Sequence, residues 1–406
     1  MRYIDLTDKT ENQITVDRED GIYLGHPTTV LLDDGRTIYT VYPKGHGVGQ
    51  LVMKRSDDAG LTWSERLPVP DSFSTSLECP TIYKLTDGDC VERLFIFAGR
   101  YPFRSSVSTD NGKSWSEFSP VGDFGGYFMS TIVETGKGEY LALFHDEGAF
   151  IHGGDTHRVE VYRAGEGADA RTRQREKKLS DDGRTWVRTS AWNLDVSENP
   201  ERDGDIWTKV YETSHGDTFA DGHYELYQIR TTDGGLTWSE PERICATKEP
   251  TKLCEPCMIK SPDGKRIAVL LRENSRKKQS MFAVTDDNGQ NWSDVKELNG
   301  VLTGDRHCAK YLRDGRLFVS FRDMNPDSPY YQNWVTWIGS FDDILHGRDG
   351  DCKLRLKKSC TLDCAYPGVE VLADGTVVAV TYGQWEENAK NYILCVRISG
   401  EEIKDY

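Results

Sequence analysis

The chain has 406 residues, 29% of them charged and 11% aromatic, and its formal net charge at pH 7 is −16. This length allows one large all-β repeat domain with an extensive core. The excess of carboxylates disfavours nucleic acid as a partner, because phosphate binding requires a basic face. No apolar run approaches the roughly 18 residues that a membrane-spanning helix needs, so we expect no membrane span.

The first residues, MRYIDLTDKTENQ, contain no basic segment followed by an apolar one, so no signal peptide is predicted. The ten cysteines lack the regular spacing of a disulfide framework. These features favour reduced thiols and a cytoplasmic location, although a secreted protein whose leader had been removed would have the same sequence. No spaced set of His and Cys indicates a metal site, no cofactor is indicated, and the sequence does not reveal the oligomeric state.

Six segments combine a turn signal with the alternating pattern of a β-hairpin. After each turn, β-branched and aromatic residues recur at every second position, as in RTIYTVY and RLFVSF, which is typical of strands. We interpret these segments as six repeated units. In chain order the turns are Asp34-Gly35, Asp87-Gly88, Gly136-Lys137-Gly138, Asp263-Gly264, Asp314-Gly315 and Asp374-Gly375.

A second repeat, Ser/Thr-x-Asp-x-Gly-x-x-Trp, follows the first four units. The Asp can accept hydrogen bonds from nearby backbone N–H groups, the Gly can adopt positive φ, and the Trp provides an apolar anchor. The phrase therefore predicts a turn between two strands and no chemistry. Its copies are residues 56–63 (SDDAGLTW), 108–115 (STDNGKSW), 231–238 (TTDGGLTW) and 285–292 (TDDNGQNW), with a weaker copy at 179–186 (LSDDGRTW).

This phrase is the Asp-box, and residues 24–397 resemble the sialidase superfamily of β-propellers. The resemblance and the unit count together predict an all-β, six-bladed propeller of four-stranded antiparallel sheets, in one domain spanning residues 1–406. The polar segment of about 164–221, which contains the weak fifth box, is interpreted as a long insertion in the third blade. A seventh blade built from this segment is the alternative. We expect the N-terminal strand to close the ring by pairing with the last blade beside the strand at 392–397.

The sequence Cys254-Glu255-Pro256-Cys257 has the C-x-x-C spacing of some redox and zinc sites. No second C-x-x-C or pair of histidines accompanies it, so we interpret both cysteines as buried packing residues. The glutamate between them is a separate candidate.

Propeller active sites lie at one mouth of the central channel, where the first strand of each blade begins and the second ends. Ionisable and aromatic residues recur at these positions in all six units, which indicates one functional site. In chain order the candidates are His26, Lys44, His46, Glu78, Arg100, Tyr127, His145, Asp146, Glu255, Arg272, Glu273, Asp305, Arg306, His307, Arg322, Asp323, Asp363, Tyr366, Tyr382 and Trp385.

The sialidase resemblance implies roles for some of these residues. In that family a Tyr of the last blade is the nucleophile, and a Glu of the fourth blade activates it; Tyr366 and Glu255 resemble this pair. A phenol avoids the repulsion that a carboxylate would meet at an acidic sugar, provided that a base accepts its proton. Arg272, together with Arg306 or Arg322, resembles two of the three arginines that bind the substrate carboxylate, for which the planar guanidinium is suited.

Two parts of the family pattern are replaced. Residues 25–27 read Gly-His-Pro where the family has an Arg-Ile-Pro-like phrase, so His26 takes the place of an arginine. The loop at 42–47 (YPKGHG) lacks the acid/base aspartate. His46 is the candidate acid/base, because imidazole titrates near neutral pH, and Asp146 or Glu78 could reach the site from neighbouring blades.

The sequence thus predicts an exo-acting glycoside hydrolase that cleaves a terminal, acidic sugar, with a carbohydrate as its partner. One alternative is a polysaccharide lyase or another histidine-centred carbohydrate enzyme, which His26 and His46 would serve. A non-catalytic carbohydrate-binding propeller is the other alternative. The products distinguish the three: a reducing sugar, an unsaturated sugar, or none.

Overall fold

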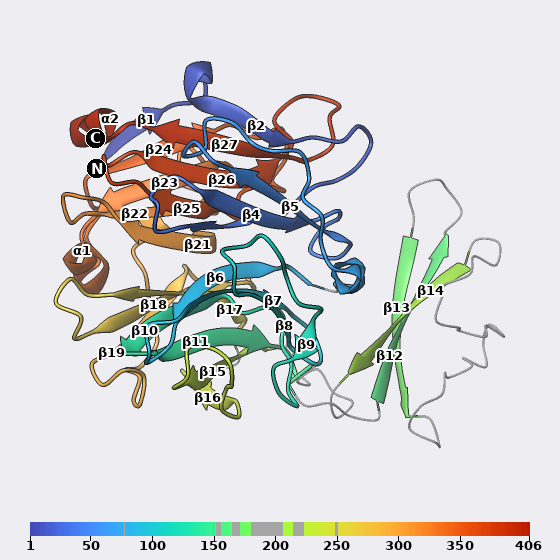
Figure 1. Ribbon diagram of the computed structural model, residues 1–406. Coiled ribbons are helices and arrows are strands. Elements are labelled where there is room, and N and C mark those ends of the chain that lie inside the picture. The colour runs from blue at the N-terminus through green and yellow to red at the C-terminus, as the bar shows by residue number, and fades with distance from the viewer. Residues whose placement is uncertain are drawn as a thin grey trace.

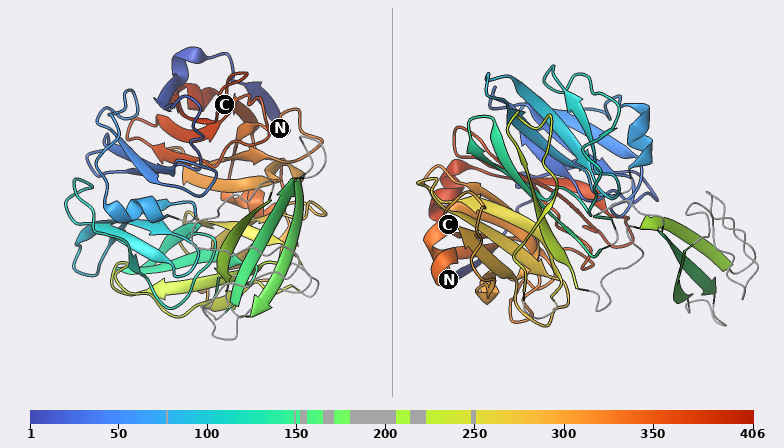
Figure 2. Two further views of the ribbon diagram at one scale, coloured as in Figure 1. Left: turned by 90° about the vertical axis from the view of Figure 1, so that its right-hand side faces the viewer. Right: turned by 90° about the horizontal axis from the view of Figure 1, so that it is seen from below.

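Six β-sheets surround a common axis, which confirms the predicted six-bladed β-propeller (Figures 1 and 2). The computed structural model describes residues 1–76, 78–148, 150–151, 156–164, 171–179, 206–213, 223–247 and 251–406. In each blade the first strand lies nearest the axis, where most neighbouring first strands contact one another. The second strands are buried on both faces in β4, β22 and β26, which explains their largely apolar sequences.

Blades I to III occupy the first part of the chain. Blade I has three strands among the described residues, and blades II and III have four each. Their bounds are β3 (Thr28–Leu31), β4 (Ile38–Pro43) and β5 (Leu51–Ser56); β6 (Thr81–Thr86), β7 (Glu92–Ala98), β8 (Arg104–Ser108) and β9 (Ser119–Pro120); and β10 (Thr131–Gly136), β11 (Glu139–Asp146), β15 (Glu225–Thr231) and β16 (Glu242–Ile244).

Blades IV to VI follow. Each contributes its own consecutive strands, and blades V and VI each gain one strand from the N-terminus. Their bounds are β17 (Leu253–Lys260), β18 (Ile267–Glu273), β19 (Met281–Thr285) and β20 (Lys296–Glu297); β21 (Gly304–Tyr311), β22 (Leu317–Asp323), β23 (Trp334–Gly339) and β24 (Cys352–Lys357); and β25 (Gly368–Val371), β26 (Val377–Gly383) and β27 (Tyr392–Ile398).

The N-terminus closes the ring as predicted, because β2 (Gln13–Asp17) pairs antiparallel with β27. In addition, β1 (Arg2–Asp5) pairs parallel with β24 of blade V, which the sequence did not indicate. The two chain ends therefore lie side by side in Figure 1. None of the helices in the described part of the chain is long and apolar enough to cross a membrane. The short helices are η1 (Thr10–Asn12), η2 (Asp71–Thr75), η3 (Gly300–Leu302), α1 (Phe341–His346) and α2 (Gly400–Asp405).

A separate three-stranded sheet is formed by the part of the chain that connects β11 to β15 of blade III. It consists of β12 (Thr156–Ala164), β13 (Arg171–Leu179) and β14 (Ile206–Thr213) and pairs with no blade among the described residues. Figure 1 shows it outside the ring, so this stretch does not form a seventh blade. Apart from Leu179, the weak fifth box lies outside the described residues. That the whole chain is one domain stays a prediction.

Apolar packing joins each blade to the next. Most buried hydrophobic residues of the described chain fall into six clusters, one between each pair of neighbouring blades. The cluster between blades VI and I, for example, contains Val380 of β26 and Tyr42 of β4. The ring is therefore stabilised by burial at every blade interface rather than within single sheets.

The four strong Asp-boxes form turns directly after the third strands of blades I to IV, as predicted. In the box at 108–115, Ser108 Oγ donates to Asp110 Oδ1 (2.8 Å) and accepts from the Gly112 N–H (2.9 Å). Asp110 also accepts from the Ser114 N–H (2.9 Å), and the other three strong boxes repeat these contacts. Gly112 has φ +80° and lies against the Tyr39 ring of blade I, so the box lets two blades approach closely.

We expect Gly112→Ala to destabilise the propeller more than Gly35→Ala, because both glycines have positive φ but only Gly112 is crowded. A Cβ at positive φ costs about 1–2 kcal/mol at either position. At Gly112 the added Cβ would also lie 2.6 Å from Tyr39 Cζ, whereas at Gly35 no described atom lies within 4 Å. Overpacking of this kind costs a further ~1–3 kcal/mol. Thermal unfolding of both variants tests this, and equal shifts would contradict it.

Candidate active site

Strained backbone occurs at one mouth of the channel, where first strands begin. φ is +56° at His26, +51° at Glu255, +49° at Arg306 and +63° at Ala365. Residues with a Cβ rarely adopt this region, and such strain is concentrated at functional sites. In β17 and β21 the strained residue lies within a β-bulge, marked by a register shift in the strand pairing. A bulge redirects a side chain, here at the start of a strand.

The bulge in β17 explains the C-x-x-C spacing. Cys254 and Cys257 are both buried, at 2% and 5% exposure, and neither forms a disulfide within the described chain. Burial raises the pKa of the Cys257 thiol to about 12, which favours the protonated packing residue that we expected.

Tyr366, Glu255 and Arg272 form one hydrogen-bonded group. The Tyr366 hydroxyl donates to Glu255 Oε1, and Arg272 Nη1 donates to Glu255 Oε1 (2.7 Å) and to Tyr366 Oη (2.9 Å). The backbone N–H of Arg306 donates to Glu255 Oε2 (2.8 Å). Burial and the Glu255 carboxylate raise the pKa of Tyr366 well above its usual value. The phenol is therefore protonated and has a carboxylate directly placed to accept its proton.

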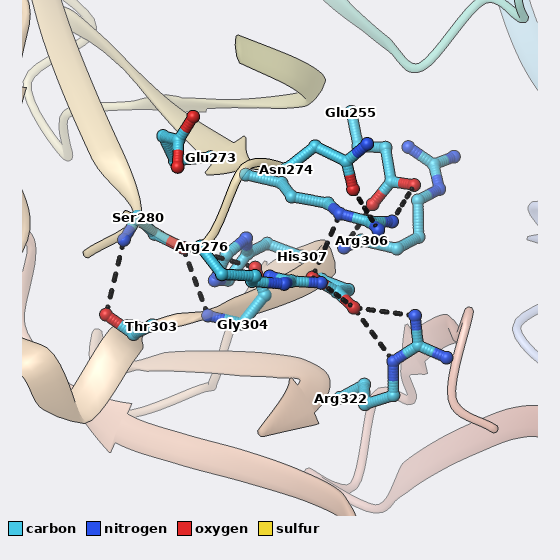
Figure 3. Close-up of polar contacts among 12 residues, drawn as sticks. Glu255, Glu273, Asn274, Arg276, Ser280, Thr303, Gly304, Arg306, His307 and Arg322 are labelled. Atoms are coloured by element: carbon cyan, nitrogen blue, oxygen red, sulfur yellow. Dashed lines mark hydrogen bonds and ion pairs between the residues drawn. The ribbon is translucent and has the colours of Figure 1, made fainter. Parts of the chain in front are cut away.

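A buried carboxylate, Asp305, holds three guanidinium groups together. It pairs with Arg272 Nε (3.1 Å), Arg276 Nη2 (2.6 Å) and Arg322 Nη2 (2.6 Å). Figure 3 shows Arg276 and Arg322 approaching this cluster from different sides, with Glu255 above them in the view. Burial acts to raise the pKa of Asp305, but Arg272, Arg322 and Arg276 outweigh it and lower the pKa. Two arginines that resemble the family's substrate clamp are thus paired with the protein's own carboxylate.

Two histidines also lie close to Tyr366. The His26 ring is 4.8 Å from the Tyr366 ring and 4.6 Å from the His46 ring, centroid to centroid. His26 is buried, and burial lowers its pKa well below the usual value. His46 is 66% exposed and contacts Tyr23 and Asp363. Tyr23 was not among the sequence candidates, because it precedes the first strand of blade I by several residues.

A cavity of about 280 Å³ lies between these groups. It also reaches Asn274, which sequence analysis missed, although Asn274 follows Arg272 at the alternating position that places both on one face. The cavity brings together several of the candidates. Those lining it are His26, His46, Glu78, Arg100, Tyr127, His145, Glu255, Arg272 and Tyr366.

Three candidates, Arg306, His307 and Arg322, are not among the residues that line this cavity. Arg306 and His307 line the central channel, a separate cavity of about 430 Å³. The Arg306 guanidinium donates to the Ser130 carbonyl (2.9 Å), which also lines this channel. The Arg322 guanidinium packs over the Tyr366 ring, 5.6 Å from its centroid, and donates to the Leu362 carbonyl.

The other candidates do not line the cavity. Lys44 Nζ pairs with Glu19 (3.0 Å). Trp385 is a core residue that packs on Trp334, 5.9 Å between centroids. Asp146 is fully buried, where one carboxylate oxygen accepts two backbone N–H groups and the other has no partner among the described residues. Burial raises the pKa of Asp146 to about 7.

Asp146 should therefore make stability depend on pH. Because its pKa is raised in the folded protein, Asp146 contributes fully to the free energy of unfolding below pH 4, which is about the pKa of an aspartate in the unfolded chain. This contribution is lost as the pH rises through about 7, and the loss is at most ~4 kcal/mol. Asp146→Asn cannot ionise and should become more stable relative to the wild type between pH 5 and pH 8. Thermal unfolding of both proteins across this range measures the difference, and a constant difference would contradict the expectation.

Comparisons with known proteins agree with this architecture. A family model for a BNR repeat-like domain matches residues 153–327. A Dyadobacter fermentans protein of unknown function superimposes with a TM-score of 0.62 at 14% identity, covering 96% of this chain and 98% of the other. A Hadza microbial sialidase superimposes with a TM-score of 0.55 at 12% identity, covering 93% of this chain and 66% of the other. No curated protein matches at the level of sequence.

These identities are low, so the two superpositions establish the shape of the chain and leave its substrate open. The family match, the four Asp-box turns and the six blades agree with one another. In fold and repeats, the chain is a six-bladed β-propeller with Asp-box turns, and its residues 153–327 match the BNR repeat-like domain family.

Proposed function

We propose that this protein is an exo-acting glycoside hydrolase that uses Tyr366 as nucleophile and Glu255 as its base. The observation that carries the proposal is the direct hydrogen bond from the phenol to the buried carboxylate, on the wall of a cavity large enough for a sugar ring. A protonated tyrosine is a weak nucleophile, and an adjacent base is the usual means of activating it.

The proposed reaction proceeds in two displacements. Tyr366 Oη forms a bond to the anomeric carbon as the glycosidic C–O bond breaks, and the phenolic proton passes to Glu255. His46 donates a proton to the departing oxygen. Water then attacks the anomeric carbon, His46 takes its proton, and Tyr366 leaves and recovers its proton from Glu255. Two inversions give net retention of configuration.

Arg272 has a clear part in this proposal. Its Nη1 contacts both the nucleophile and the base. Its positive charge therefore lowers the free-energy cost of transferring the proton from Tyr366 to Glu255. The same guanidinium lines the cavity with Arg100, which is the support for an acidic sugar. Glu78 and Glu255 line it too, so the positive charge available to a substrate carboxylate is limited.

We expect Tyr366→Phe to lower kcat by at least about a thousandfold while leaving substrate binding largely intact, because only the reacting oxygen is removed. Tyr311→Phe is the matched control: it deletes a phenol whose one hydrogen bond among the described residues is to the Lys260 carbonyl (2.6 Å), and it should retain activity. Release of a reducing sugar is measured for each variant. Full activity in Tyr366→Phe would exclude this nucleophile, and an unsaturated product would identify a lyase.

We also expect ordinary α-sialosides to be poorer substrates than glycosides of sugars whose carboxylate is not on the anomeric carbon. His26 replaces an arginine of the family clamp, and Asp305 already pairs with Arg272 and Arg322. Loss of one charge-assisted pair corresponds to about 1.5–3 kcal/mol, or roughly 10- to 150-fold. Comparison of kcat/KM for 4-methylumbelliferyl sialoside and hexuronide tests this, and preference for the sialoside would refute it.

A further inference from the structure

Asp363 accepts hydrogen bonds from two tyrosines behind the histidine pair. The Tyr23 hydroxyl donates to its Oδ2 (2.8 Å), and the Tyr382 hydroxyl donates to its Oδ1 (2.9 Å). Asn391 Nδ2 donates to its backbone carbonyl (2.7 Å), which holds the segment in place. Burial acts to raise the pKa of Asp363, but the nearby His46 ring and the hydrogen bonds from Tyr23 and Tyr382 outweigh it, so the pKa is lowered and the carboxylate is ionised.

Counting protons around Asp363 determines the tautomer of His46. Nδ1 of His46 lies 2.8 Å from Tyr23 Oη and 3.5 Å from Asp363 Oδ2. An ionised carboxylate can only accept, and Tyr23 uses its single proton on Asp363, so the Tyr23 oxygen can only accept from His46. Nδ1 of His46 therefore carries the proton. In the neutral ring Nε2 then has a free lone pair, and no described residue occupies it.

The same count gives His26 the opposite tautomer. Its Nδ1 accepts from the Gly47 N–H (3.1 Å) and so carries no proton. Its Nε2 lies 3.3 Å from the Tyr382 hydroxyl, whose proton is used on Asp363, so Nε2 is the donor. Both nitrogens of His26 are thus engaged within the protein, and burial keeps its ring neutral.

We propose that Asp363 is the positioning residue of the site: through Tyr23 and Tyr382 it fixes opposite tautomers on His46 and His26. As a result, Nε2 of His46 is the one nitrogen of the pair that can exchange a proton with a molecule in the cavity. The tautomers follow from the hydrogen bonds alone. The consequence for catalysis rests on the proposed function, in which His46 protonates the leaving oxygen.

The groups that face His46 come from three blades. Tyr23 and His26 precede the first strand of blade I, Glu78 precedes that of blade II, and Asp363 precedes that of blade VI. Of the two carboxylates among them, Asp363 is the one linked to His46 through a bridging hydroxyl, that of Tyr23. Glu78 instead accepts from the Cys79 N–H (3.0 Å) and pairs with Arg100. The carboxylate of Glu78 is therefore paired with Cys79 and Arg100 rather than with His46.

The first test reads the tautomers without any substrate. Long-range ¹H–¹⁵N correlation spectra of ¹⁵N-histidine-labelled protein at pH 8 are assigned by the signals lost in His46→Gln and His26→Gln. We expect a protonated Nδ1 on His46 and a protonated Nε2 on His26. In Tyr23→Phe, which keeps the ring but removes the bridging hydroxyl, His46 should become a mixture of tautomers. A protonated Nε2 on His46 in the wild type, or no change in Tyr23→Phe, would overturn the proposal.

The second test measures the pH dependence of kcat/KM with a poor leaving group and with an activated aryl glycoside. Removing the negative charge in Asp363→Asn should move the alkaline limb to lower pH by about half a unit or more. The loss of rate should be larger for the poor leaving group, because its departure depends on protonation by His46. Asp314→Asn, which deletes a carboxylate in the exposed turn before β22, is the control and should change neither.

The outcomes separate this inference from the proposed function. If Tyr366→Phe abolishes activity but Asp363→Asn and Tyr23→Phe leave the pH profile unchanged, Asp363 does not position His46 and the hydrolase proposal stands. If the wild type cleaves no glycoside, the hydrolase proposal fails, and the tautomers measured by NMR still decide whether Asp363 fixes the two rings. Should Asp363→Asn fail to fold, the tautomers of His46 in Tyr23→Phe still decide the inference.

Discussion

The pairing of β2 with β27 is the interaction on which the rest of the structure depends. It joins the start of the chain to the last blade, from Gln13 beside Val396 onward, and so removes the free edge that an open ring would expose. The candidate site lies across this closure. His26 of blade I is 4.8 Å from Tyr366 of blade VI only because the first and last blades are held together.

Charges at the mouth are paired largely within the protein. A buried carboxylate stays ionised only when it is paired, and Asp305 has three guanidinium partners. This arrangement holds Arg272 rigidly, with Nη1 directed at Glu255 and Tyr366 and Nη2 directed at Asn274. The same network that stabilises the mouth thus orients the nucleophile and base that we propose.

The two histidines differ in what they can bind because their surroundings differ. His26 is enclosed and bonded at both ring nitrogens, whereas His46 is exposed on one side and bonded at Nδ1. Chemically identical side chains therefore have different capacities for proton transfer. The protein surroundings of each ring, rather than its intrinsic titration, decide which one can act on a ligand.

The sequence by itself determined the features that depend on short-range contacts. The Asp-box turns could be predicted because every hydrogen bond of a box lies within a few residues, as from Ser108 to Gly112. Blade number and ring closure followed from the repetition of these signals. Tyr366 and Glu255 could be paired in advance because they resemble the nucleophile and base of the sialidase pattern, and the structure places them in hydrogen-bond contact.

Only the tertiary structure decided what lies between the repeats. No sequence pattern shows that Asp305 pairs with arginines of two blades, that Tyr23 reaches Asp363, or that the Arg306 side chain turns into the channel. These contacts join residues far apart in the chain. They depend on how the bulges of β17 and β21 redirect neighbouring side chains, because a shift of one position in a strand moves a residue to the opposite face.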